Sequence, residues 1–581
     1  MAYLNFHSLY EKFPETRVDG YDDEVFCGNA AVMAALQRAV QNRHVLVVDC
    51  YPGVDDEALL PELQRAIRPA LTIDMRDVFP DGDELTRRMQ SHLTEDRVRG
   101  VMYYGTVLDF LDEPALQAAR EAVTACEGTA LVYGFGAALV TRGDVLVYAD
   151  LARWEIQLRY RKGMPNYKQH NEDEDILRKY KRGFFVEWRI ADRHKRDLYD
   201  EIDFYLDAND AAAPKLVSGA GFREGLRAVS RQPFRLAPYF DPGVWGGQWM
   251  KEVCGLDRDT PNFAWSFDGV PEENSLLLRY GDVRVETPAM NLIQYLPRLV
   301  LGERTFARFG AEYPIRFDFL DTMGGQNLSL QVHPDTEYIR SHFGMTYTQD
   351  ESYYILDACE GGGVYLGLKE GVNPQAMIAD LERAQTGECP FDAERYVNFF
   401  PAQKHDHFLI PAGTVHCSSS NCMVLEVSAT PYIFTFKLWD WDRLGLDGRP
   451  RPIHIEDGKH VIRFDRTTPW VRENLVDHFE TLADKPEYTE VRTGLHPLEF
   501  VETRVYTVRD HVDFPADGEF SMLNLVDGQR AVVESPSGAF EPYEVHYAET
   551  FILPAAAGAF RIRPVAPDQP CKVLRANVRH P

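Results

Sequence analysis

The chain has 581 residues, of which 45% are hydrophobic and 12% are aromatic, so it is globular and too long for one ordinary domain. Its 90 acidic and 62 basic side chains give a net charge of −28. This balance argues against nucleic acid as a partner, because nonspecific binding to a duplex depends on cations that meet phosphates.

The cysteines and the first residues bear on the compartment. Nine cysteines are scattered along the chain without a CxxC pair, which favours free thiols in a reducing cytoplasm over disulfides. The opening stretch, MAYLNFHSLYEKFPETRVDGYDDE, lacks a basic head followed by an apolar core, and no apolar run is long enough to span a bilayer. We therefore expect a soluble cytoplasmic protein with no membrane partner.

Residues 1–215 are expected to form an α/β domain. Amphipathic stretches at 57–67 and 113–123 predict helices. Short apolar runs around them predict five strands, at 44–49, 70–74, 100–105, 130–136 and 144–149. This alternation is typical of a mainly parallel sheet with crossover helices.

The segment DCYPGVDDEALL (49–60) follows the first of these strands, where a nucleoside-kinase-like fold keeps its phosphate loop. The similarity is one of position only, because that loop needs a Lys and a Ser or Thr. Here Asp55, Asp56 and Glu57 occupy the turn and the helix start, and their carboxylates would repel a phosphate. We expect a degenerate P-loop domain kept for packing or regulation, with nucleotide binding as the alternative.

Two further segments of this third stand out by composition. Residues 153–200 are dense in charges of both signs, which predicts a solvated helical face or lid, with an anion-binding patch as the alternative. Residues 207–225 are rich in Ala, Gly and Pro, so we expect a linker or domain boundary there.

From residue 233 the chain changes to short alternating strands separated by turns, which predicts a β-sandwich or barrel. Gln331 and His333 lie two apart and would share one strand face. Glu351 begins another apolar run, and His416 follows a Pro-Ala-Gly turn. Taken singly, each is more often a buried structural histidine or a solvent-facing carboxylate. Together they could hold a divalent metal, and imidazole with carboxylate and amide oxygens suits zinc.

Several segments in order resemble one family, the type I phosphomannose (mannose-6-phosphate) isomerases, which are zinc-dependent bicupin enzymes. The similarity extends over roughly residues 235–580. The segments that carry it are FDPGVWGGQWMKEVCGL (240–256), RFDFLDTMGGQNLSLQVHPD (316–335), DESYYILDACEGGGVYLGLKEGV (350–372), FLIPAGTVHCSSSNCMVLEVS (408–428) and FKLWDWDRLGLDGRPRPIHIEDGKHVI (436–462). The resemblance implies two jelly-roll domains after the α/β domain, a metal-binding cupin at 233–465 and a second cupin at 466–581.

The resemblance also implies site residues and a reaction. Four side chains would bind Zn²⁺: Gln331, His333, Glu351 and His416. Ser329 would line the sugar pocket, and Glu426 and Lys437 would be catalytic. The reaction would interconvert mannose 6-phosphate and fructose 6-phosphate through an enediol, which needs a base near the carbon acid and a Lewis acid on the oxygens. Glu426 is the candidate base.

Three positions depart from the family pattern. Lys437 stands where the family usually carries an arginine, Asp318 where many members carry a lysine, and Gln349 where some carry another lysine. Fewer cations weaken the case for a phosphorylated substrate, although Lys437, Arg443 and Arg340 could still hold a phosphate. An isomerase of an unphosphorylated or different sugar, or a non-catalytic sugar sensor, therefore remains an alternative.

The last part of the chain predicts a cupin without metal. ETFILPAAAGAF (549–560) echoes HFLIPAGTVHCS (407–418) but has no histidine at the corresponding place. Nothing in the sequence indicates the oligomeric state.

Overall fold

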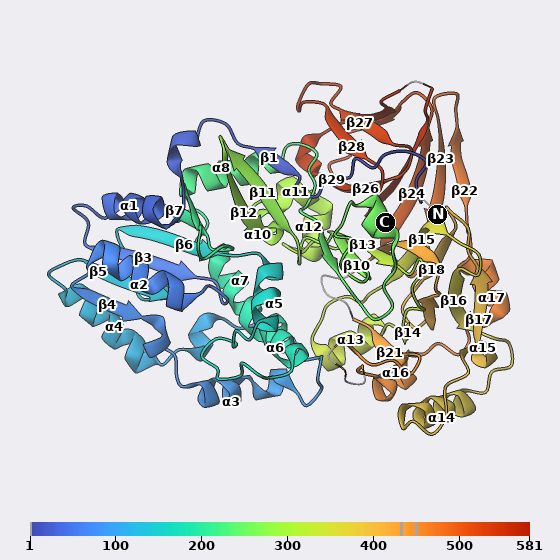
Figure 1. The fold of residues 1–581 in the computed structure, drawn as a ribbon, viewed down its shortest axis with the longest axis horizontal. Helices are drawn as coiled ribbons and strands as arrows, with labels where there is room; N and C mark the ends of the chain where they lie inside the picture. Colours follow the sequence, from blue (N-terminus) through green and yellow to red (C-terminus); the bar gives the residue numbers. More distant parts are fainter. Residues whose placement is uncertain (1–2, 430–433, 447, 449–450, 567, 581) are drawn as a thin grey trace.

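A computed structural model describes residues 3–429, 434–446, 448, 451–566 and 568–580. The described residues form six β-sheets with helices around them, so the chain is mixed α/β. In Figure 1 the N-terminal sheet and its helices lie on the left, the β-rich remainder lies on the right, and β11, β12 and α10 lie between them.

The N-terminal sheet has seven strands in the order β2-β8-β7-β6-β3-β5-β4. Their bounds are β2 (Val25–Cys27), β3 (Val45–Cys50), β4 (Leu71–Asp74), β5 (Ala130–Gly134), β6 (Val145–Asp150), β7 (Phe204–Asp207) and β8 (Lys215–Ser218). The pairs from β4 to β7 are parallel, and β8 pairs antiparallel with β7 and β2. Four of the five predicted strands are therefore present.

The fifth predicted strand, at 100–105, does not form. Its apolar side chains resemble those of a strand, but its backbone N–H groups form no hydrogen bonds to a neighbouring strand. They donate instead to scattered carbonyls, Val101 to His92, Met102 to Phe343 and Tyr103 to Phe185. The segment is an extended connection that ties the N-terminal part to the β-rich part.

Helices cover this sheet and continue toward the β-rich part. They are α1 (Asn29–Ala39), α2 (Asp56–Ile67), α3 (Gly82–Leu93), α4 (Glu113–Ala125), α5 (Arg153–Arg161), α6 (Ile176–Arg182), the π-helical turn η5 (Gly183–Glu187), α7 (Trp188–Arg196) and α8 (Gly219–Val229). The predicted helices at 57–67 and 113–123 are α2 and α4. Each begins at an aspartate cap and buries one apolar face.

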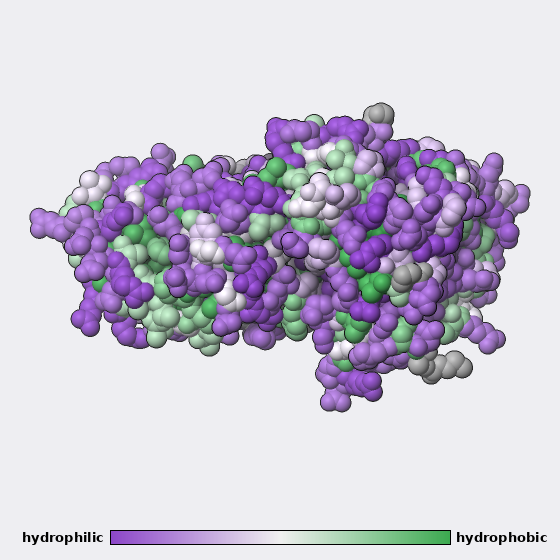
Figure 2. Space-filling model, turned by 90° about the horizontal axis from the view of Figure 1, so that it is seen from above, coloured by the Kyte–Doolittle hydropathy of each residue, from purple (hydrophilic) through white to green (hydrophobic). Residues whose placement is uncertain are grey.

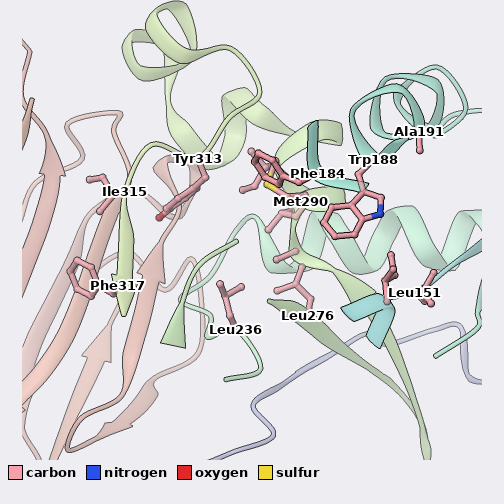
Figure 3. Close-up of a cluster of buried hydrophobic side chains, with 14 of the residues drawn as sticks. Leu151, Phe184, Trp188, Ala191, Leu236, Leu276, Met290, Tyr313, Ile315 and Phe317 are labelled. Atoms are coloured by element: carbon pink, nitrogen blue, oxygen red, sulfur yellow. The ribbon is translucent and has the colours of Figure 1, made fainter. Parts of the chain in front are cut away.

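The prediction of a solvated face at 153–200 is correct only in part, because charged residues such as Lys162, Glu172 and Arg178 are exposed but most of those from 179 to 195 are buried. Lys179, Arg182 and Glu187 are buried, and Arg182 Nε lies 2.6 Å from Glu187 Oε1. The mixed charges pair with one another inside the protein, which satisfies them away from water. Phe184 and Trp188 from the same stretch belong to the hydrophobic core, and Figure 3 draws them in one buried cluster with residues of the β-rich part.

The prediction of a linker at 207–225 is also wrong. These residues supply β8 and the start of α8, whose first turn is capped by Ser218 Oγ accepting from Gly221 N. The glycines serve close packing. A Cβ at Gly219 would lie 1.8 Å from the Ile202 carbonyl oxygen.

A small three-stranded sheet joins the two parts. Its order is β1-β11-β12, and β1 runs parallel to β11. The elements are β1 (Glu15–Arg17), β11 (Ser275–Tyr280) and β12 (Val283–Pro288), followed by α10 (Ala289–Tyr295), α11 (Pro297–Leu301) and α12 (Glu303–Phe309).

Two antiparallel sheets carry the candidate site. The larger has the order β18-β15-β20-β13-β10-β9 and the smaller β17-β16-β19-β14-β21. The larger contains β9 (Tyr239–Asp241), β10 (Trp265–Gly269), β13 (Arg316–Asp321), β15 (Glu351–Ala358), β18 (His407–Ile410) and β20 (Cys422–Ser428). The smaller contains β14 (Leu330–Val332), β16 (Gly363–Leu368), β17 (Val397–Pro401), β19 (His416–Ser418) and β21 (Phe436–Trp439).

Six helices accompany these two sheets. They are α9 (Trp249–Val253), α13 (Thr336–Phe343), α14 (Pro374–Gln385), α15 (Ala393–Tyr396), α16 (Ile455–Val461) and α17 (Thr468–Asn474).

The C-terminal part is a second pair of antiparallel sheets, ordered β22-β23-β24-β31-β26-β29 and β25-β30-β27-β28. Its strands are β22 (Glu480–Asp484), β23 (Tyr488–Gly494), β24 (Val501–Val508), β25 (Val512–Phe514), β26 (Ser521–Asp527), β27 (Arg530–Glu534), β28 (Tyr543–His546), β29 (Thr550–Leu553), β30 (Phe560–Pro564) and β31 (Cys571–Val578). It encloses a hydrophobic core of its own.

The described helices include none that is both long and apolar enough to cross a membrane. Hydrophilic residues cover most of the face drawn in Figure 2, and apolar residues are scattered among them.

Candidate metal and substrate site

Three of the predicted metal ligands converge at the ends of three strands. His333 follows β14, Glu351 opens β15 and His416 opens β19, and all three side chains are buried. His333 Nε2 lies 3.1 Å from Glu351 Oε2, and His416 Nε2 lies 2.7 Å from Glu351 Oε1. Among the residues that the structure describes, this is the only group of three or more His, Cys, Asp and Glu side chains with ligand atoms so close together.

The hydrogen bonds of the two imidazoles explain what this group can hold. Nδ1 of His333 lies 2.9 Å from the Phe434 carbonyl oxygen, and Nδ1 of His416 lies 2.8 Å from that of Thr414. A carbonyl oxygen only accepts, so in the neutral rings Nδ1 carries the proton and Nε2 keeps a lone pair. Two lone pairs and a carboxylate then face one another, and none of the three side chains directs a donor at the other two. A divalent cation would satisfy all three, so the residues fit a metal site.

Gln331, the fourth predicted ligand, lies beside this group. It pairs with His416 across β14 and β19, and its amide Nε2 lies 3.1 Å from His416 Nε2. The two ends of an amide are interchangeable by rotation, so its oxygen could face the same point. The structure thus brings together all four side chains that the resemblance implied.

Gln349 supports the group from behind. Its Nε2 donates to Glu351 Oε2 at 2.8 Å, and its Oε1 accepts from the Phe434 backbone N–H at 2.6 Å. It therefore orients Glu351 and also Phe434, whose carbonyl oxygen accepts the hydrogen bond from His333 Nδ1. The glutamine at 349 thus supports two of the residues that form the site.

A cavity of about 350 Å³ lies against the group. Its walls come from both parts of the chain. The β-rich part contributes among others Ser329, Gln331, Gln349, Glu426 and Lys437, and the N-terminal part contributes Val98, Arg99, Gln157, Arg161, Leu177 and Tyr180. The predicted catalytic and sugar-binding residues therefore share one cavity with Gln331, the predicted metal ligand among its lining residues.

One wall of the cavity is acidic. Glu426 on β20 lies opposite Asp318 on β13, and both are buried. Burial, and then the negative charges of Glu351 and Asp318, raise the pKa of Glu426 well above its usual range. Asp318 is paired with Arg316 at 2.7 Å, yet burial still raises its pKa to about 6. Glu426 is thus a buried carboxyl group whose pKa is held above that of an ordinary glutamate.

The opposite side carries cations. Burial, and then the positive charge of Arg451, lower the pKa of Lys437 to about 7. Arg451 Nη1 lies 3.0 Å from Asp440 Oδ1, and Arg443 Nη2 lies 2.7 Å from the same oxygen. Ser329 Oγ also donates to this oxygen, at 2.6 Å. Asp440 thereby fixes two arginines and the predicted pocket serine.

Of the three cations predicted to hold a phosphate, Lys437 lines the cavity and Arg443 is held by Asp440. Arg340 is exposed on α13, and neither Arg340 nor Arg443 is among the residues that line the cavity. The sequence analysis overlooked Arg99 and Arg451. Arg451 belongs to the quoted 436–462 segment, of which residues 447, 449 and 450 lie outside the described residues. Arg99 lies in the N-terminal part, where no motif signals it.

The degenerate phosphate loop has a defined structure. Asp55 Oδ1 accepts from Ala58 N at 3.0 Å and so caps α2, taking an N–H group that a phosphate would need. Asp56 accepts from the Tyr133 hydroxyl at 2.8 Å, and burial raises its pKa to about 6. A hollow of about 1030 Å³ opens beside these residues. Its loop offers carboxylates where a phosphate loop offers donors.

We expect the full-length protein not to hydrolyse ATP or transfer its γ-phosphoryl group. The Lys and the Mg²⁺-binding hydroxyl are missing, and Asp55 already occupies the helix start. Phosphate release from Mg-ATP should equal the buffer blank. Release above the blank that disappears in Asp55→Asn would contradict this prediction.

The N-terminal part and a larger portion of the chain match different known proteins. A family described as a domain of unknown function, DUF8485, matches residues 28–231. Mannose-6-phosphate isomerase ManA of Bacillus subtilis is 24% identical over 335 residues, which are 58% of this chain and 96% of that protein. Mannose-6-phosphate isomerase of Streptococcus mutans is 26% identical over 235 residues, which are 40% of this chain and 68% of that protein.

Among solved structures, the mannose 6-phosphate isomerase from Bacillus subtilis aligns with a TM-score of 0.49 and 17% identity, over 60% of this chain and 99% of that chain. The chain is therefore similar to mannose-6-phosphate isomerases at low identity, over more than half of its length.

Proposed function

We propose that this protein is a zinc-dependent aldose–ketose isomerase that interconverts mannose 6-phosphate and fructose 6-phosphate through an enediol. The observation that carries the proposal is the buried His333, Glu351 and His416 group, whose imidazole Nε2 atoms and carboxylate converge beside a cavity that Gln331 and Gln349 line. The similarity to mannose-6-phosphate isomerases supports a sugar-phosphate isomerase.

Gln331, His333, Glu351 and His416 would hold the metal, and imidazole with oxygen ligands suits zinc. When bound, a divalent metal polarises the carbonyl and hydroxyl oxygens of a sugar and stabilises the negative charge that develops on them.

The side chains of the cavity divide the remaining work. Glu426 takes the proton from the carbon next to the carbonyl and returns it to the neighbouring carbon, since its raised pKa makes its carboxylate a stronger base than an ordinary one. Lys437 stabilises negative charge from the opposite side. Ser329, held by Asp440, positions a sugar hydroxyl.

We also propose the domain division that the resemblance implies. The two sheets around the cavity would be a metal-binding cupin at 233–465, and the second pair of sheets a cupin at 466–581 without a role in metal binding. The N-terminal α/β domain, a degenerate P-loop-like fold predicted over 1–215, would extend through α8, because β8 belongs to its sheet and α8 follows β8 directly.

A substrate panel tests this proposal. Zinc-loaded protein is assayed with mannose 6-phosphate, fructose 6-phosphate, free mannose and free fructose. We expect turnover of the two phosphorylated sugars with much higher kcat/KM than of the free ones. A preference for free sugars would instead favour an isomerase of unphosphorylated sugar, and binding without turnover would favour a sugar sensor.

Lys437→Met should lower kcat/KM by about 30- to 1000-fold, because a charge in a partly desolvated pocket contributes roughly 2–4 kcal/mol to the transition state and 1.4 kcal/mol is tenfold. Lys437→Arg, which keeps the charge, should retain most activity.

The ammonium form of Lys437 is present below the pKa of about 7 and is lost above it. The wild-type kcat/KM should therefore fall above pH 7, and that of Lys437→Met should not show this decrease. Near-full activity of Lys437→Met with its zinc in place would remove Lys437 from the site.

A further inference from the structure

Arg99 brings the N-terminal part of the chain into the cavity. It lies in the connection after α3, is only 4% exposed and lines the cavity. Its guanidinium carbon lies 5.2 Å from the ring centre of Phe434 and 4.9 Å from that of Phe436. Phe436 opens β21, which also carries Lys437. An arginine from a distant part of the sequence is thus packed onto the strand that supplies the candidate catalytic lysine.

Hydrogen bonds hold the Arg99 connection from both sides. Asp96 Oδ1 accepts from the backbone N–H of Val98 and of Arg99, both at 2.6 Å, and Thr94 Oγ1 donates to the Arg99 carbonyl at 2.7 Å. Further along, Met102 N donates to the Phe343 carbonyl at 2.9 Å. The backbone around Arg99 is therefore fixed to α3 on one side and to the end of α13 on the other.

Arg99 adds to a concentration of positive charge. Burial lowers the pKa of Lys437, and three arginines, Arg451, Arg99 and Arg443, lower it further, whereas Asp440 opposes them. The pKa of His454, which also lines the cavity, is lowered to about 2 by burial and then by the charges of Arg99 and Lys437. A partly enclosed space with several cations attracts an anionic group.

At positions 318 and 349, where the resemblance leads one to expect lysines, the side chains carry no positive charge and interact with other residues. Gln349 holds Glu351, and Asp318 is paired with Arg316. Ser329, which directly precedes β14, and Gln331 both line the cavity, and two residues of extended backbone place them about 7 Å apart. Ser329 belongs to the cationic side and Gln331 to the metal-binding group, so a ligand of hexose size could reach both.

We propose that Arg99 is a substrate-binding residue, and that the N-terminal part of the chain thereby completes the sugar site by receiving the phosphate group of a sugar phosphate. This inference rests on the proposed function. It assigns the N-terminal part a role in recognition of the substrate, and it explains how the cavity can bind a phosphate without the lysines that the resemblance leads one to expect at 318 and 349.

Binding and turnover by zinc-loaded full-length protein test this assignment. The binding probes are mannitol 6-phosphate and mannitol, which lack a carbonyl and cannot be isomerised, and calorimetry gives their Kd. Arg99→Met should raise the Kd for mannitol 6-phosphate, and the KM for mannose 6-phosphate, by roughly 10- to 100-fold, because a hydrogen bond to a charged group is lost. Arg99→Lys should lie between this variant and the wild type, and kcat should change by less than about threefold, as expected for loss of uniform binding.

Arg97→Met is the matched control. Arg97 lies in the same connection and is paired with Asp175 at 2.6 Å, and it does not line the cavity. We expect its Kd and KM to stay near those of the wild type. Equal losses in Arg97→Met and Arg99→Met, or equal losses on phosphorylated and free sugars, would show that Arg99 only supports the fold and would overturn the proposal.

The two proposals fail in different ways. A wild-type protein that binds mannitol 6-phosphate through Arg99 but isomerises no sugar would refute the proposed function and leave the role of Arg99 intact. A wild-type protein that binds mannitol and mannitol 6-phosphate equally well would overturn the role of Arg99. If Arg99→Met does not fold, as judged from its melting temperature, the comparison of Arg99→Lys with Arg97→Met decides the question.

Discussion

Replacing both His333 and His416 with alanine should reduce bound zinc from about one ion per chain to nearly none, and isomerase activity by at least about 1000-fold. The reason is the arrangement of acceptors around Glu351. Without the two imidazoles only Glu351 and Gln331 remain, and two oxygen ligands cannot hold zinc against water. Metal analysis of the dialysed protein, together with the isomerase assay, measures both effects.

The control for this variant is His342→Ala/His460→Ala, which removes two exposed histidines of α13 and α16. It should keep its zinc and its activity.

Removal of metal by a chelator should lower the melting temperature of the wild type and leave that of His333→Ala/His416→Ala unchanged, because a ligand stabilises only the form that binds it. Unchanged zinc content in the His333/His416 variant would refute the site.

The metal group could be anticipated because its signals are local. Gln331 lies in β14 and His333 directly follows it, so two residues that are two apart in an extended segment can be expected on one face. The turn before His416 needs a backbone that glycine adopts readily, since Gly413 has a φ of +89°, and it delivers the histidine onto β19. Patterns of this kind can be recognised in a single sequence because they do not depend on contacts between distant segments.

Other features depend on contacts between distant segments and could not be anticipated. The 100–105 run has the apolar residues of a strand but no neighbouring strand to pair with. Glycines at 219 and 221 suggest a linker by composition, whereas close packing of α8 requires them. Lys179 and Arg182 of α6 are buried because each meets a partner that the sequence does not reveal. Arg99 belongs to this class, since its neighbours Phe434 and Phe436 lie more than 300 residues away.

Glu426→Gln should lower kcat by about 100- to 10,000-fold while zinc stays bound, because general acid–base catalysis by one positioned group contributes a factor of this size. The substitution keeps the shape of the side chain and removes only its ability to exchange a proton. It also removes a charge that repels Glu351 and Asp318, so the variant should be at least as stable as the wild type.

Exchange with solvent deuterium distinguishes a base from a residue that merely packs. An enediol mechanism lets the transferred proton exchange while the base carries it, so wild-type protein should incorporate deuterium at the carbon that is reprotonated. Glu426→Gln should lose this incorporation together with turnover.

Asp318→Asn is the informative comparison. Asp318 lies opposite Glu426 on the adjacent strand, is also buried and is already paired with Arg316. We expect Asp318→Asn to lose stability, since Arg316 is left buried without its carboxylate, but to retain deuterium incorporation per turnover. If instead Glu426→Gln still incorporates deuterium and Asp318→Asn does not, the base is Asp318, and the raised pKa of Glu426 only reflects its buried position among other carboxylates.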